Sequence, residues 1–143
     1  MTKDAFGSDG FATDAAFAPE VIKSGPRRRP EREIVSEALT HLRGLPQGYA
    51  RKVHGGVMGN VGEPDVDACV RGRAVKLEAK AEGNKPTSPQ LAALRRWGRA
   101  GALVGWFRVL EHVQQLLEHL DEPLFIPDLS YPGCRCPRHV ATP

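Results

Sequence analysis

Residues 62–80 read GEPDVDACVRGRAVKLEAK and contain two short segments joined by a turn that includes a glycine. In each segment every second residue is apolar, the period of two that is typical of a strand with one buried face. The apolar positions are Val66, Ala68 and Val70, then Val75, Leu77 and Ala79. The stretch therefore predicts a β-hairpin in which the acidic and basic side chains share the other face.

A two-residue loop at Arg71 and Gly72 would fix the pairing of these two strands. Counting back from the turn along both strands then places Asp65 opposite Glu78, with their Cβ atoms about 5 Å apart. Two carboxylates at this separation form an oxygen site suited to a divalent cation such as Mg²⁺, and Lys80 adds a positive charge one pleat further on. A metal beside an ammonium group suits the handling of phosphate.

Length, charge and composition narrow the class of protein. The 143 residues suit one domain with tails. Residues 85–108 contain five basic side chains and no acid, a distribution that suits a polyanionic partner. No apolar run reaches the roughly 18 residues needed to cross a bilayer, and the N-terminal residues lack the pattern of a signal peptide. We therefore expect a cytoplasmic protein with no membrane partner, and three cysteines argue against a secreted disulfide scaffold.

The chain divides into three parts. Residues 1–29 have a linker-like composition and are expected to form a disordered tail, whose basic run at residues 27–29 is either a solvated linker or an arm that contacts phosphate. Residues 30–120 form the predicted domain. Residues 121–143 contain five prolines and are expected to form a tail that follows the surface.

Within the domain, helical spacing of apolar residues predicts helices over residues 30–43, 88–100 and 110–120. The last helix has an apolar stripe of Leu110, Val113, Leu117 and Leu120. Residues 49–54 and 102–109 predict two further strands.

Several basic residues are candidates for DNA contacts. Lys52 and His54 share a face of the strand predicted over residues 49–54, just before a glycine-rich loop, and His54 is either a phosphate or metal-shell residue or an ordinary surface histidine. Arg95, Arg96 and Arg99 lie on the more exposed side of the helix predicted over residues 88–100. These arginines suit binding to phosphates.

Cysteines and histidines near the C-terminus form a C-x-C-x-x-H pattern of Cys134, Cys136 and His139. A structural zinc ion needs four ligands, and the fourth is missing unless another chain or His119 supplies it, so the sequence favours free thiols. The third cysteine, Cys69, alternates with Asp65; it could lie at the edge of the site, but the expectation is a small buried residue.

The motifs in their order resemble the PD-(D/E)xK nuclease superfamily, through Glu31 on a helix, Pro64–Asp65, the LEAK run at residues 77–80 and a downstream Gln90. The start of the first helix, at residues 31–36, is similar to that of archaeal-type Holliday-junction resolvases. The middle of the chain resembles VRR-NUC domains, with a K-x-h-G-G stretch, a G-x-P-D strand, a G-R turn, an E-x-K strand and a Gln-led helix. The matching positions are residues 52–56, 62–65, 72–73, 78–80 and 88–90.

This resemblance implies a restriction-endonuclease-like α/β core, with a mixed sheet of about four strands flanked by helices. It also implies a DNA endonuclease dependent on Mg²⁺ or Mn²⁺, acting on branched or structured DNA such as a junction or flap during replication, repair or recombination. The implied metal ligands are Asp65, Glu78, the Ala79 carbonyl and, directly or through water, Glu31. Lys80 would orient the attacking water.

Three questions stay open at this point. Gln90 would position either Lys80 or the phosphate, and Glu33 or Glu37 could replace Glu31 as the helix acid. A homodimer is neither indicated nor excluded. The alternative function is a catalytically silent module of the same fold that binds branched DNA through its helix arginines, in which case Glu78 and Lys80 form an ordinary solvated ion pair.

Overall fold

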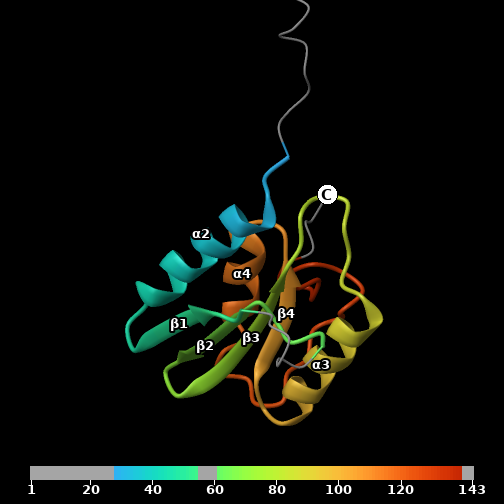
Figure 1. Cartoon of the computed structure of the whole chain (residues 1–143). Helices are drawn as coiled ribbons and strands as arrows, with labels where there is room; N and C mark the ends of the chain where they lie inside the picture. Colours follow the sequence, from blue (N-terminus) through green and yellow to red (C-terminus); the bar gives the residue numbers. More distant parts are fainter. Residues whose placement is uncertain (1–27, 55–60, 140–143) are drawn as a thin grey trace, which may run out of the picture.

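The computed structural model describes residues 28–54 and 61–139. Within them lies one four-stranded sheet in the order β1-β2-β3-β4, shown in Figure 1. The strands are β1 (Gly48–Lys52), β2 (Val66–Val70), β3 (Arg73–Ala79) and β4 (Leu103–Phe107). The first three are antiparallel and β4 runs parallel to β3. The prediction of a mixed sheet flanked by helices is confirmed. Residues 1–27 of the predicted N-terminal tail and most of the glycine-rich loop lie outside the described residues.

Helices cover both faces of the sheet (Figure 1). The helices α2 (Glu31–Arg43) and α4 (Leu110–Leu117) pack on one face over a large apolar cluster that includes Leu42, Leu77 and Phe107. The helix α3 (Ser88–Arg99) lies on the other face over a smaller cluster around Trp106. Because α3 connects β3 to β4, those two strands can run parallel.

The last helix differs from its predicted span of residues 110–120. It ends at Leu117, and the residue that lies fully buried near its end is Leu116, which was absent from the predicted stripe. Leu116 packs against Gly105 of β4, where an added Cβ atom would lie only 2.5 Å from a Leu116 methyl group. Gly105 therefore allows α4 to approach the sheet closely, which the periodicity of the helix alone does not reveal.

The predicted hairpin is present in the predicted register. Val70 pairs with Arg73 and Val66 pairs with Leu77. The two loop residues, Arg71 and Gly72, have φ values of 49° and 83°. Positive φ at both central positions is the geometry of a type I′ turn, which matches the twist of the strands it joins.

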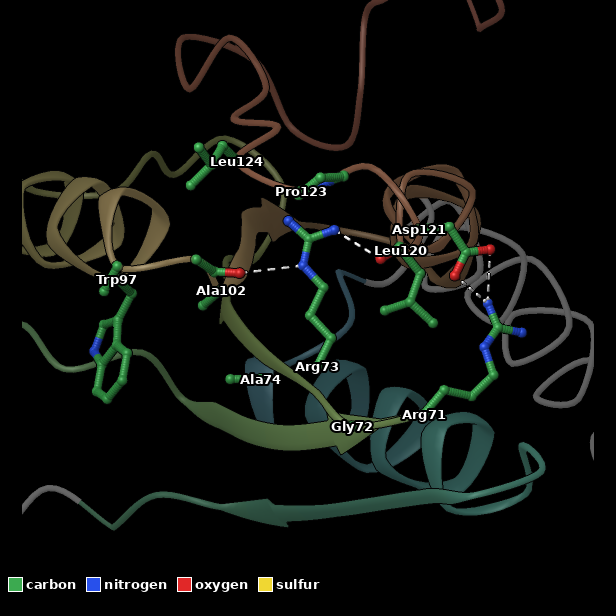
Figure 2. A pocket seen from close by; sticks show the side chains of 12 residues that line it. Arg71, Gly72, Arg73, Ala74, Trp97, Ala102, Leu120, Asp121, Pro123 and Leu124 are labelled. Carbon is green, nitrogen blue, oxygen red and sulfur yellow. Dashed lines mark hydrogen bonds and ion pairs between the residues drawn. The ribbon is translucent and has the colours of Figure 1, made fainter.

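Two arginines attach this turn to the segment after α4 (Figure 2). The Arg73 guanidinium donates hydrogen bonds to the backbone carbonyls of Gly101, His119, Leu120 and Glu122, over 2.7 to 3.2 Å. Arg71 pairs with the exposed Asp121 at 3.2 Å. These contacts border a hollow whose lining includes Trp97, Leu120 and Leu124 but none of the predicted catalytic residues. We therefore interpret the hollow as a structural feature of the turn.

The segment after α4 also contributes to the core. Leu129 and Cys134 are buried, in the smaller and the larger apolar cluster respectively. The Trp106 indole donates a hydrogen bond to the Leu129 carbonyl at 2.9 Å, and the Gly133 amide donates to the Trp106 carbonyl at 2.8 Å. Residues 129–134 are thus bound to the last strand of the sheet.

Among the residues that the structure describes, no helix is both long and apolar enough to cross a membrane.

Gly72→Ala should destabilise the protein by about 1 kcal/mol, because only glycine adopts a φ of 83° without steric cost. An added Cβ atom would meet nothing within 4 Å, so the effect would come from the backbone alone. Gly44→Ala is the matched control, since Gly44 has a φ of −82° and ordinary contacts. We expect the control to be neutral or slightly stabilising in urea unfolding; equal losses in both variants would contradict the turn assignment.

Candidate active site

The predicted catalytic residues come together where four segments meet. Glu78 lies near the end of β3 and Lys80 directly after it, while Asp65 directly precedes β2. Glu31 lies in the first turn of α2 and Gln90 in the first turn of α3. The hairpin register brings the first three residues together, and the starts of two helices add the other two.

Asp65 is held against the end of β3 by the backbone. Its Oδ2 atom accepts a hydrogen bond from the Ala79 amide at 3.0 Å. The pairing of Val66 with Leu77 places Asp65 and Glu78 at the next position of the same ladder. The close approach of these two acids, which the sequence predicted from the turn, is thus present in the structure.

The Glu78 carboxyl is the most deeply buried acid of the site, with 2% of the residue exposed. Its Oε2 atom accepts a hydrogen bond from the Gln90 side-chain amide at 3.0 Å and lies 3.7 Å from Lys80 Nζ. Its Oε1 atom is buried and has no hydrogen-bond partner among the described residues. Burial, then the negative charge of Asp65, raises the pKa of Glu78 to about 9, with Lys80 opposing and Glu31 adding to the shift.

Gln90 links the site to the start of α3. It forms a capping box with Thr87. Gln90 Oε1 accepts a hydrogen bond from the Thr87 backbone amide at 2.8 Å, and Thr87 Oγ1 accepts one from the Gln90 backbone amide at 3.4 Å. The Nε2 atom of the same side-chain amide donates a hydrogen bond to Glu78 Oε2. The sequence predicted that Gln90 would position Lys80 or a phosphate, so its contact with Glu78 is a difference. The capping box fixes the side chain in the orientation that reaches Glu78.

The structure distinguishes the three helix acids by their partners. Glu31 Oε2 accepts a hydrogen bond from the Ala81 amide at 3.4 Å, and the charge of Glu31 acts on Glu78. Glu33 and Glu37 instead face Arg29, at 4.0 and 3.4 Å. Glu31 is therefore the helix acid that lies at the site.

A second charged group on the same face was not singled out from the sequence. Lys76 Nζ lies 2.6 Å from Asp67 and 3.9 Å from the centre of the Trp97 ring, and Arg51 contacts the same carboxylate. Burial tends to raise the pKa of Asp67, but Lys76 and Arg51 outweigh it and hold the pKa below its usual value. Both cations are already paired with the Asp67 carboxylate, so we assign the group to the stability of the sheet. The register of the hairpin, which pairs Asp67 with Lys76, could have revealed it.

Of the residues predicted to bind DNA, the three arginines are exposed on α3. Lys52 ends β1 and pairs with Val66, so it lies on the other sheet face from Asp67. His54 is exposed beyond the strand, and the expectation that both residues share a strand face is wrong because β1 ends at Lys52. Cys69, expected to be buried, is exposed since it alternates with buried residues on β2.

The donor set suits a hard divalent cation. Asp65, Glu78 and Glu31 offer carboxylate oxygens, the ligands preferred by Mg²⁺ and Mn²⁺. The unpartnered Oε1 atom of Glu78 is a buried acceptor that such an ion would satisfy. A cation would also offset the repulsion between the carboxylates that raises the pKa of Glu78. The implied ligand role of the Ala79 carbonyl stays a prediction.

Gln90→Ala should destabilise the protein by about 2 kcal/mol, because it removes both the capping bond and the only amide hydrogen bond described for the buried Glu78 carboxyl. Thr87→Ala is the control, since it removes a capping bond and leaves the Glu78 contact intact. Chemical unfolding should give a loss of about 1 kcal/mol for the control. If both variants lose the same amount, the contact with Glu78 contributes nothing to stability.

Known proteins provide a comparison for this fold and this site. No family model matches the sequence, and no curated protein matches it. A solved structure titled "VRR_NUC domain" is similar, with 30% sequence identity and a TM-score of 0.53. The alignment covers 62% of this chain and 95% of that chain, so nearly the whole of that domain has a counterpart here. The chain therefore belongs to the VRR-NUC family of nuclease-like domains.

Proposed function

We propose that the protein is a DNA endonuclease dependent on Mg²⁺ or Mn²⁺ that hydrolyses phosphodiester bonds in branched or structured DNA, such as a junction or flap, during replication, repair or recombination. One observation supports this most strongly: the buried Glu78 carboxyl lies beside Asp65, Glu31 and Lys80 with one oxygen unpartnered among the described residues. An acid whose pKa is raised by burial and by neighbouring acids is unfavourable for folding alone and is typical of a functional site.

In this proposal Asp65 and Glu78 hold the metal, with Glu31 and the Ala79 carbonyl completing its environment. The metal, when bound, supplies a water of lowered pKa and neutralises the charge that develops on the phosphate. Gln90 keeps the Glu78 carboxyl in place through its hydrogen bond to Oε2, which leaves Oε1 directed away from that contact. The Ala79 amide does the same for Asp65. Both carboxylates are thus positioned before any ligand arrives.

Lys80 supplies the positive charge that the reaction needs. Its side chain is only 12% exposed, and its Nζ atom lies 3.7 Å from Glu78. An ammonium group held in this partly dry position can orient the attacking water and stabilise the negative charge of the transition state. The low exposure strengthens both effects, because water screens the charge less.

The arginines of α3 suit the binding of the DNA backbone. Arg95, Arg96 and Arg99 are exposed, and no ion pair within residues 28–54 and 61–139 involves them. They follow Gln90 on the same helix by five to nine residues, or roughly 7 to 14 Å along its axis. A strand cleaved at Glu78 could therefore continue along α3 with its phosphates next to these arginines.

Asp65→Asn should lower the rate of cleavage at least about a hundredfold, or roughly 2.7 kcal/mol in activation free energy, because it removes a metal-binding charge. DNA affinity should hold or rise, since one negative charge leaves the phosphate site. Glu78→Gln should behave alike, and Lys80→Ala should lose cleavage while still binding metal. The assay uses labelled junction, flap and linear DNA with Mg²⁺ or Mn²⁺.

Asp67→Asn is the matched control for this series. It makes the same chemical change two residues away on the same strand face, where Asp67 already pairs with Lys76 and Arg51. The control should cut DNA at a rate within a few-fold of the parent. Full cleavage in excess EDTA would refute the metal dependence. Parent-like rates in all three site variants, or no cleavage by the parent, would instead favour the silent DNA-binding module.

Arg95→Ala combined with Arg96→Ala should weaken DNA binding and reduce its salt dependence. The slope of log K against log [salt] is negative, and each lost phosphate contact reduces its magnitude by about 0.9. The control is Arg43→Ala with Arg71→Ala, which removes equal charge from the end of α2 and from the hairpin turn. Fluorescence anisotropy at several salt concentrations measures both slopes. An unchanged slope in the α3 variant would exclude these arginines from the DNA interface.

A further inference from the structure

Four metal-binding side chains meet on the α4 side of the molecule, apart from the carboxylate site. They are His119, directly after α4, and Cys134, Cys136 and His139 from the C-terminal segment. One ligand atom from each lies within 4.8 Å of every other. The sequence favoured free thiols because the fourth ligand was unassigned, and the fold places His119 in that position.

Three of the ligand–ligand distances lie within a few tenths of an ångström of those around a tetrahedral zinc ion. His119 Nε2 lies 3.2 Å from Cys134 Sγ and 3.4 Å from Cys136 Sγ, and Cys136 Sγ lies 3.2 Å from His139 Nδ1. Zinc bonds of about 2.3 Å to sulfur and 2.0 Å to nitrogen separate neighbouring ligand atoms by roughly 3.3 to 3.8 Å. One imidazole nitrogen has a single proton or a single lone pair, so it cannot satisfy two thiols at once.

Carboxylates lie beside the outer nitrogens of both imidazoles, and Glu122 holds the His119 ring by a hydrogen bond. Glu122 Oε2 lies 2.7 Å from His119 Nδ1 and is itself held by Arg138 at 2.7 Å. Glu118 Oε2 lies 3.0 Å from His139 Nε2, but this nitrogen makes no hydrogen bond within the described residues. A proton on His119 Nδ1 leaves the lone pair of Nε2 facing the sulfurs, the arrangement common around histidine-bound metals.

The surroundings of the cluster suit a closed, structural site. His119 and Cys134 are buried, and the His119 ring stacks on Phe125 at 3.8 Å between centroids. The Cys136 amide points at Cys134 Sγ at 3.4 Å, a donor that would stabilise a thiolate. Two thiolates, two neutral imidazoles and one Zn²⁺ have no net charge, which lowers the cost of burial. No fifth ligand position is needed for such a site.

We propose that His119, Cys134, Cys136 and His139 bind one Zn²⁺ ion that attaches the C-terminal segment to the end of α4. Residues 118–139 form no regular helix or strand, and among the described residues one backbone–backbone hydrogen bond, from Gly133 to Trp106, joins them to the sheet. A zinc ion bound by His119 and by residues 134–139 would join the two ends of this segment and hold both next to the end of α4. The ion is structural and distinct from the proposed catalytic metal, because its ligands include sulfur and nitrogen and no carboxylate.

The test measures metal content and a spectrum, independently of nuclease activity. The full chain, purified under reducing conditions, should contain about one zinc per chain by elemental analysis. After zinc removal, Co²⁺ should give the intense visible bands of a tetrahedral site together with thiolate charge-transfer absorption. Cys134→Ser and His119→Gln should abolish the bands, whereas Cys69→Ser should keep them because Cys69 lies outside the cluster. Asp65→Asn should also keep the bound zinc.

Two milder variants protect the test against loss of folding. Glu122→Gln leaves all four ligands in place and should weaken zinc binding about tenfold to a hundredfold through the His119 imidazole. Glu118→Gln also keeps the four ligands and should weaken it less, because Glu118 makes no hydrogen bond to His139. Absence of zinc together with absence of a tetrahedral Co²⁺ spectrum in the reduced parent protein would overturn the proposal. A Cys134–Cys136 disulfide that forms in place of metal binding, or loss of zinc in Cys69→Ser, would do so equally.

Discussion

The register of the β2–β3 hairpin is the constraint on which the rest of the structure depends. A slip of β3 by one residue would move Val75 and Leu77 from the core to the opposite face. The same slip would separate Asp65 from Glu78, which now occupy neighbouring positions of one ladder. The type I′ turn at Arg71 and Gly72 fixes this register, so one local geometry determines both the core and the candidate active site.

The candidate active site lowers the stability of the fold, because it places an acid in the sheet near the end of β3. Glu78 lies between fully buried Leu77 and Ala79, and its raised pKa shows that its charged form is disfavoured there. A folded-state pKa above the unfolded value means that the metal-free protein loses stability as the pH rises from about 4.5 towards 9. The surrounding apolar clusters and the Gln90 contact must offset that loss. The proposed metal-binding role would account for an acid in this position.

The two sites differ in chemistry as well as in location. The carboxylates at the end of β3 suit a hard cation with open positions for water and phosphate. The sulfur and nitrogen atoms after α4 suit a closed zinc site. The first is assembled by the hairpin and by two helix starts, whereas the second ties down a segment that lacks regular structure. This difference in ligands would allow both ions to be bound without exchange between the sites.

The sequence by itself determined the hairpin, its turn and the closeness of Asp65 to Glu78, because a period of two and a glycine at the turn are local properties. It also determined that three segments form helices and, through its motifs, implied the mixed α/β class. Tertiary structure decided which helix acid reaches the site, that Gln90 contacts Glu78, and that Leu116 packs on Gly105. It also brought His119 to the C-terminal cysteines. Each of these depends on how distant segments pack, and the spacing of residues along one segment contains no information about that.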